Sequence, residues 1–286
     1  MTACFFPPFC YNYEKEVIGL FLRERSTVRT ASFEMDYLRF GSGSDVFVIL
    51  PGLSVKSVLG SAAAIARQYA AIAEKFTVYL FDRRREIPSS YTVEEMASDT
   101  AEAMDALGLR GVCLFGASQG GMIAQVIAIK RPELVTKLIL GSSAARVADG
   151  QFEVLDRWID LSKRGDRVGL YLDFGERIYP HYFFEKYRDA LVAIAGTITD
   201  EELRRFEILA EGTKGFDVTG DLCRVLCPVF VIGAQDDRVL GPDAADLIVG
   251  SLPRSEENRV HIYDGFGHAA FDTAPDYCER LLGFIS

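Results

Sequence analysis

The chain has 286 residues, which is enough for one large domain or two small ones. Hydrophobic residues make up 49% and charged residues 25%, so the composition is that of a globular protein that can bury a full core. The net charge of −10 makes nucleic acids and anionic membranes poor partners, and no apolar stretch is long enough to span a membrane.

Short β-rich runs alternate with helical patterns along most of the chain. In the first half, strands are predicted at residues 45–50, 77–81, 112–115 and 137–140, with helices at 61–74 and 92–107 and a third that ends near Arg131. Thr92 and Glu95 have the spacing of a capping box at the start of the second helix. In the last third, strands are predicted at 229–233 and 259–263, and helices near 243–250 and 275–284.

Continuous apolar strands separated by helices predict an α/β fold with a mostly parallel central sheet and helices on both faces. The alternation stops at 146–220, a helical, aromatic and charged segment. An insertion between two sheet strands is expected at their carboxyl ends, where open α/β sheets bind ligands. We therefore predict an α/β core of residues 1–145 and 221–286 and a helical cap, or lid, of residues 146–220. The alternative is a helical decoration with a small core of its own.

The most informative segment is Gly116-Ala117-Ser118-Gln119-Gly120, between a predicted strand and a predicted helix. A G-x-S-x-G sequence there is typical of a nucleophile elbow, a sharp turn that exposes its serine above the helix N-terminus. The serine of such a turn has a strained backbone, so its neighbours must be small. The pattern alone arises by chance in about one chain in ten of this length, so it needs support from other residues.

A nucleophilic serine needs a base, and the base needs an orienting acid. Of the three histidines, His261 lies within a predicted strand and His181 in the predicted cap. His268 lies in a glycine-rich loop after the last strand, on the edge where the serine emerges, and is the predicted base. The loop after the preceding strand offers Asp236 and Asp237. One would accept the Nδ1 proton of the histidine, while the other would cap a turn or stay solvated.

The chain order of serine, aspartate and histidine is that of the α/β-hydrolases. From about residue 33 to the end, the chain resembles the α/β-hydrolase fold superfamily with a helical cap. The resemblance rests on Leu50-Pro-Gly-Leu53, Phe81-Asp-Arg83, Gly116-Ala-Ser-Gln-Gly-Gly121, Pro132-Glu133, Lys137-Leu-Ile-Leu140, Gly233-Ala-Gln-Asp-Asp-Arg238 and Gly265-Phe-Gly-His268. The family's acid loop commonly reads Asp-x-Val-x-Pro, which favours Asp237 over Asp236, although Gly241 replaces the proline.

The resemblance also implies an oxyanion hole made of two backbone N–H groups, those of Gln119 and Leu53. The family's usual histidine before the loop glycine is replaced by Pro51, which puts the geometry of that loop in question. A second departure follows Asp82-Arg83, where residues 84–88 replace the usual Gly-x-Gly-x-Ser. In the family this loop borders the site, so residues 84–88 could shape the pocket, bind an acidic group or be a solvated charged loop. The role of the run Arg83-Arg84-Arg85 is left open.

The resemblance implies a carboxylesterase-like serine hydrolase that cleaves an ester or related acyl substrate. In this mechanism Ser118 forms an acyl-enzyme, His268 transfers the proton and Asp237 orients His268. The alternatives are a carbon–carbon bond hydrolase on the same triad and a non-catalytic ligand-binding protein of this fold. The aromatic residues of the predicted cap suggest a small-molecule substrate with an apolar acyl or aromatic group.

No cofactor or metal is expected, because a dinucleotide fingerprint is missing and Cys223 and Cys227 have no second ligand pair. The six cysteines are scattered, which favours a reducing cytoplasm. The apolar residues 5–9 lack a basic n-region and do not resemble a signal peptide. They are expected to pack on the body of the protein or on a partner, which leaves a homodimer open.

Overall fold

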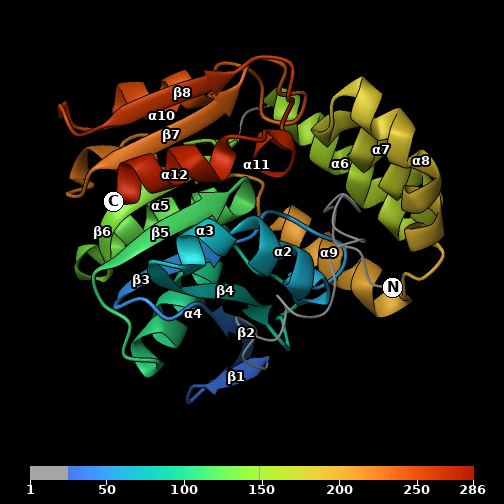
Figure 1. The fold of residues 1–286 in the computed structure, drawn as a ribbon. Helices are drawn as coiled ribbons and strands as arrows, with labels where there is room; N and C mark the ends of the chain where they lie inside the picture. Colours follow the sequence, from blue (N-terminus) through green and yellow to red (C-terminus); the bar gives the residue numbers. More distant parts are fainter. Residues whose placement is uncertain (1–24, 148) are drawn as a thin grey trace.

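The computed structural model describes residues 25–147 and 149–286. In this part of the chain, eight strands form one sheet in the order β1-β2-β4-β3-β5-β6-β7-β8 (Figure 1). The strands are β1 Ser26–Arg29, β2 Glu34–Phe40, β3 Asp45–Leu50, β4 Phe76–Arg84, β5 Val112–Ala117, β6 Val135–Gly141, β7 Val229–Ala234 and β8 Arg259–Tyr263.

Strands β3 to β8 run parallel to one another, and β2 pairs antiparallel with both of its neighbours, β1 and β4. The predicted α/β fold with a mostly parallel sheet is therefore confirmed. The sequence analysis did not predict β1 and β2. These two strands lie at one edge of the sheet and mix buried residues with partly or fully exposed ones, so they lack the continuous apolar run of the inner strands.

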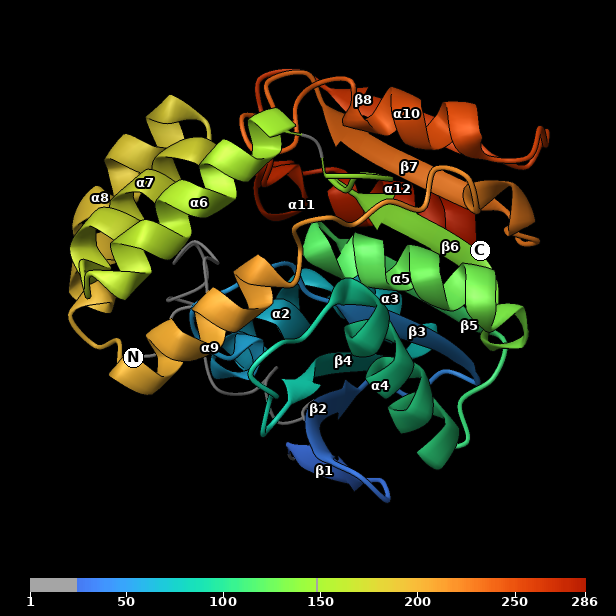
Figure 2. The ribbon, with the colours of Figure 1, turned by 180° about the vertical axis from the view of Figure 1, so that it is seen from behind.

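Helices cover both faces of the sheet (Figures 1 and 2). One face packs against α2, α3 and α12, and the other against α4, α5 and α10. The bounds of the helices around the sheet are α2 Ala62–Gln68, α3 Ala70–Ala73, α4 Val93–Ala106, α5 Gln119–Lys130, α10 Ala244–Ser251, α11 Ala270–Thr273 and α12 Tyr277–Ile285, with 3₁₀ turns at Val58–Ser61, Pro132–Leu134 and Leu222–Arg224.

Local sequence signals predict some of these helix bounds correctly and others incorrectly. The capping box is formed, with the Thr92 hydroxyl accepting from the Glu95 N–H and the Glu95 carboxylate accepting from the Thr92 N–H. The single helix predicted at 61–74 is wrong, because it is split at Tyr69 into α2 and α3. The Tyr69 ring is buried against Phe47 and Phe115, a tertiary contact that helical periodicity does not show.

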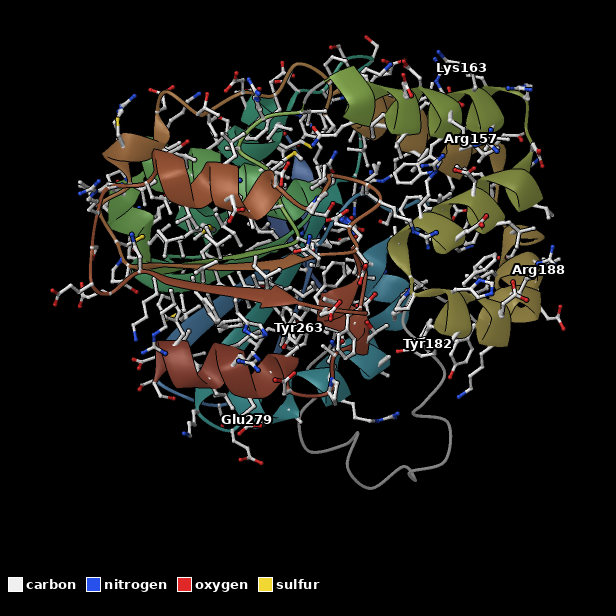
Figure 3. All side chains as sticks on the ribbon, turned by 90° about the horizontal axis from the view of Figure 1, so that it is seen from above. Arg157, Lys163, Tyr182, Arg188, Tyr263 and Glu279 are labelled. Atoms are coloured by element: carbon white, nitrogen blue, oxygen red, sulfur yellow. The ribbon has the colours of Figure 1, made fainter. Side chains whose placement is uncertain are left out.

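The segment between β6 and β7 is helical and lies beside the carboxyl ends of the strands (Figures 1 and 2). Its helices are α6 Asp149–Lys163, α7 Arg167–Ile178, α8 His181–Ala195 and α9 Asp200–Glu211. A bridge between Arg146 and Asp217 joins the two ends of the segment, so the chain leaves and re-enters the sheet layer at one place. Lys163 and Arg188 lie at the periphery of these helices, away from the sheet (Figure 3).

None of the helices in the described residues is both long and apolar enough to cross a membrane. The prediction for the apolar residues 5–9 falls outside the described residues, as do Cys4 and Cys10.

Candidate active site

The order of the strands fixes where a site can form. The chain passes from β3 to β4 on one side and then returns to place β5 on the other side of β3. Such a reversal leaves a crevice at the carboxyl ends of the two strands. Leu50 at the end of β3 pairs with Gly116 near the end of β5, so the loop after β3 lies directly beside Ser118.

Ser118 occupies a tight turn between β5 and α5. Its φ of 51° and ψ of −120° lie in a region that L-residues rarely adopt, as a nucleophile elbow requires. The two pattern glycines are needed for space: a Cβ on Gly116 would lie 2.3 Å from the Gly120 carbonyl oxygen. A Cβ on Gly120 would lie 2.1 Å from the Leu50 carbonyl oxygen. The spacing G-x-S-x-G therefore follows from the close approach of β3, β5 and α5.

His268 lies in the loop after β8, and both of its ring nitrogens have partners. Nε2 is 3.0 Å from the Ser118 Oγ, and Nδ1 is 2.8 Å from the Asp237 Oδ2. The histidine and the aspartate side chains are both buried, at 5% and 4% exposure. The structure thus brings together the three side chains that the sequence analysis selected, in a continuous line of hydrogen bonds.

The two neighbouring aspartates have different partners. Asp237 Oδ1 accepts hydrogen bonds from the N–H groups of Val239 and Leu240, while Oδ2 faces His268. Asp236 instead accepts from the Gly265 N–H, at the base of the histidine loop. Burial alone would raise the pKa of Asp237, but His268 and the two N–H donors more than offset this and hold that pKa below its usual value. Asp237 is therefore a buried carboxylate.

Leu53 and Gln119 line the same pocket as Ser118 and His268. Gln119 is the first residue of α5, so its N–H is one of those without an intrahelical partner. Gly52 lies so close to the elbow that a Cβ there would be 3.2 Å from the Ser118 Cβ. The loop after β3 therefore approaches the serine closely, although Pro51 replaces the histidine of the family pattern.

Arg83, near the end of β4, hydrogen-bonds to this loop. Its buried guanidinium donates to the Pro51 carbonyl at 2.8 Å and to the Gln119 Oε1 at 3.1 Å. The Gln119 amide donates in turn to the Leu209 carbonyl of α9 and to the Thr213 hydroxyl. Burial lowers the pKa of Arg83 to about 10, so it stays charged at neutral pH. This network links the elbow, the loop after β3 and the helical segment.

The sequence analysis left the role of the run Arg83-Arg84-Arg85 open. In the structure the three residues differ in burial and in their partners. Arg83 precedes the loop of residues 84–88; it is buried and donates hydrogen bonds to protein groups. Arg84 pairs with Asp99 at 3.3 Å, and the more exposed Arg85 pairs with Glu34 and Asp36. The signal that could have found Arg83 is its position at the end of an apolar strand, since β4 continues to Arg84.

The pocket beside Ser118 is largely apolar. Its walls come from the loop after β3, from α2 and α5, from the loops that carry Asp237 and His268, and from the helical segment. The apolar lining side chains from that segment and its first connection are Val147, Leu155, Trp158, Phe174 and Ile178. A small molecule with an apolar part fits such walls.

The other histidines lie apart from this pocket. His181 is exposed at the start of α8, and His261 lies in β8, as the sequence analysis placed them. In the described part of the chain, no group of three or more His, Cys, Asp or Glu side chains could hold a metal ion.

Comparison with known proteins agrees with the fold. The model of the alpha/beta hydrolase family matches residues 47–281. The chain is 32% identical to a protein of Caulobacter segnis named carbamate hydrolase RutD, over 85% of this chain and 92% of that protein. It is 26% identical to human serine hydrolase BPHL, over 75% of this chain and 71% of that protein.

The fold also matches a crystal structure, that of MGS-M2, an alpha/beta hydrolase enzyme from a Medee basin deep-sea metagenome library. The TM-score is 0.80 and the identity 21%, over 91% of this chain and 96% of that one. The relatives named above are hydrolases by name, and the family model covers most of the chain. This protein is a hydrolase, and it belongs to the alpha/beta hydrolase family.

Proposed function

We propose that the protein cleaves an ester or related acyl substrate through an acyl-enzyme on Ser118. The observation that carries the proposal is the hydrogen-bonded line from Ser118 through His268 to Asp237, at 3.0 and 2.8 Å. His268 Nε2 accepts the proton of the serine hydroxyl as Oγ attacks the carbonyl carbon, and then delivers it to the leaving group. Asp237 fixes the Nδ1–H tautomer and stabilises the imidazolium. Water then attacks the acyl carbonyl with His268 as the base; the carboxylic acid leaves, and His268 returns the proton to the Ser118 Oγ.

The oxyanion of this reaction would be bound by the backbone N–H groups of Gln119 and Leu53. Their support is the position of both residues in the pocket wall and the close approach of Gly52 to Ser118. Each such donor contributes about 3–4 kcal/mol to the stability of the transition state. Because only the backbone donates, the proline at position 51 does not remove either group.

We further propose that residues 146–220 act as a lid over this pocket and that the substrate carries an apolar acyl or aromatic group. The support is the row of apolar side chains that α6 and α7 contribute to the wall, with Trp158 and Phe174 in ring contact. Carbamates belong in the range of substrates to test, since a relative is named for them and the same serine can attack their carbonyl.

The test is to trap the acyl-enzyme. The protein is mixed with p-nitrophenyl esters of two to eight acyl carbons and with an aryl carbamate, and its intact mass is read within the first turnovers. We expect a mass increase equal to the acyl or carbamoyl group, located at Ser118 by peptide mapping, and the same site labelled by a fluorophosphonate. Labelling at another residue, or ligand binding without any adduct or turnover, would contradict the proposal.

A change at Arg83 tests whether the buried arginine positions the oxyanion loop. Arg83→Met removes the donor from the Pro51 carbonyl and from the Gln119 side chain. We expect kcat to fall by about 10²-fold with a smaller change in KM, because misplacing a catalytic group by about 1 Å has that effect. Arg84→Met is the matched control, since Arg84 lies next on the same strand and pairs with Asp99 outside the site. Equal losses for the two variants would show a general loss of stability instead.

A further inference from the structure

Two buried polar side chains behind the nucleophile elbow have no part in the mechanism above. Gln125 lies in α5, where every residue from Gln119 to Ile129 is buried. Ser143 lies two residues after the end of β6. The exposed fractions of Gln125 and Ser143 are 0% and 4%. Burying an amide or a hydroxyl is unfavourable unless the group forms hydrogen bonds, so the partners of these side chains indicate what they do.

Ser143 donates a hydrogen bond to the backbone of the nucleophile. Its hydroxyl oxygen lies 2.9 Å from the carbonyl oxygen of Ser118. The Gln125 Nε2 lies 3.4 Å from the same hydroxyl and also donates to the carbonyls of Gly121 and Ala144, at 3.1 and 3.0 Å. Because an amide NH₂ group can only donate, the Ser143 oxygen accepts from it, and the Ser143 proton is directed to the Ser118 carbonyl.

The carbonyl that accepts this hydrogen bond belongs to the peptide between Ser118 and Gln119. The peptide is trans, so its carbonyl and the Gln119 N–H point in opposite directions. The same carbonyl also accepts from the N–H groups of Gly121 and Met122, at 2.9 and 3.2 Å. Fixing the direction of the carbonyl therefore also fixes the direction of the N–H that we assign to the oxyanion hole.

The chain around Ser143 is attached directly to the elbow. The Ser118 N–H donates to the carbonyl of Gly141, the last residue of β6, at 2.8 Å. A Cβ on Gly121 would lie 2.5 Å from the Ser143 Oγ, so the glycine that follows the G-x-S-x-G pattern leaves room for this hydroxyl. A hydrogen bond accepted by a carbonyl also polarises its peptide and strengthens the N–H of that peptide as a donor.

We propose that Ser143 is a positioning residue of the oxyanion hole, whose hydroxyl orients and polarises the peptide that presents the Gln119 N–H. The inference rests on the proposed function of Ser118. Ser143 is not among the residues that line the pocket, so it acts through Gln119 rather than by contact with the substrate. An oxyanion forms when the serine is acylated and again when water removes the acyl group, so Ser143 assists both steps.

Ser143→Ala removes this donor and leaves the three triad side chains unchanged. We expect kcat for p-nitrophenyl butanoate to fall by about three- to tenfold, less than the roughly 10²- to 10³-fold loss when an oxyanion donor is removed outright. The rate constants of acylation and deacylation, measured by stopped flow, should fall by the same factor. KM should then stay unchanged, because it depends on substrate affinity and on the ratio of these two rate constants.

Two further measurements distinguish an effect on the oxyanion from a loss of stability. A trifluoromethyl ketone that adds to Ser118 forms an oxyanion, so its affinity should fall by the same factor as kcat, whereas the affinity of the corresponding alcohol should not change. Labelling with ¹⁵N-glutamine gives amide signals for the five glutamines of the chain, including Gln119. In Ser143→Ala the Gln119 amide proton should shift upfield, since its peptide is less polarised.

The matched control is Ser251→Ala. It removes a serine hydroxyl that donates to the Leu247 carbonyl at 2.8 Å in α10, a helix that contributes no residue to the pocket. This variant should keep kcat, the ketone affinity and the Gln119 signal at their wild-type values. Equal effects of the two variants, or an unchanged kcat or an unchanged Gln119 signal in Ser143→Ala, would each overturn the positioning role.

Failure of the proposed function gives a different result. If the wild type neither turns over esters nor adds the ketone, Ser118 is not an acyl-transfer nucleophile, and the oxyanion role of Ser143 is wrong with it. Normal turnover by the wild type together with an unaffected Ser143→Ala variant overturns only the role of Ser143.

Discussion

Replacing Ser118 by alanine should lower kcat for p-nitrophenyl esters by about 10⁴-fold or more. The expected loss is this large because no other group of the site can form the acyl-enzyme, and His268 then has no hydroxyl to deprotonate at its Nε2. The variant should still bind the substrate, since the apolar walls of the pocket are unchanged. The checks are the steady-state rate, the fluorophosphonate adduct by intact mass, and the affinity for a non-hydrolysable ketone analogue.

The matched control is Ser90→Ala, a change at an exposed serine of a surface loop. It should keep the wild-type rate and the full adduct. If Ser118→Ala is labelled as strongly as the wild type, the nucleophile lies elsewhere and the proposed mechanism is wrong. Residual turnover near 10⁻⁴ of the wild-type rate is consistent with the mechanism, because the oxyanion donors and substrate binding act without the serine.

Replacing Asp237 by asparagine should lower kcat by about 10⁴-fold, the effect expected when a triad histidine is held in the wrong tautomer. The asparagine has nearly the same shape, but its amide can donate a proton where Asp237 Oδ2 now accepts one from His268. The other oxygen would still accept from Val239 and Leu240, so the loop should keep its conformation. Rates measured from pH 5 to 9, together with circular dichroism of the folded variant, check this expectation.

The adjacent aspartate provides the control for that variant. Asp236 accepts from the Gly265 N–H, and an asparagine side chain can do the same with its amide oxygen. Asp236→Asn should therefore lose no more than a few-fold in kcat. The reverse ranking of the two variants would assign the orienting acid to Asp236, against the geometry of the buried pair.

Much of the architecture was predictable because it depends on local and periodic signals. Short, β-rich apolar runs such as 112–115 and 229–233 predicted buried strands, and their alternation with helices implied a parallel sheet covered on both faces. The fold in turn predicted that loops after successive strands emerge on one edge. For this reason Ser118, His268 and the Asp236-Asp237 pair could be placed together before any contact was known.

Other features could not be predicted, because they depend on groups distant in the chain. The edge strands β1 and β2 lack continuous apolar runs, and the Tyr69 ring at the break between α2 and α3 packs against the distant residues Phe47 and Phe115. The run of three arginines does not by itself show that Arg83 is buried and Arg85 exposed; the signal that bears on this is the position of Arg83 at the end of an apolar strand. Only the loop after β3, packed over the end of β4, supplies the Pro51 carbonyl that holds it.

The elbow sequence, the order of its candidate partners and the sheet that carries them were determined by the sequence alone, since each depends on residue type and spacing along the chain. The tertiary structure decided which aspartate faces His268 and which arginine hydrogen-bonds to the loop after β3. These depend on directions and burial of side chains from separate strands and loops. The directions of these side chains are fixed only when the strands pack into one sheet and water is excluded from the site at their carboxyl ends.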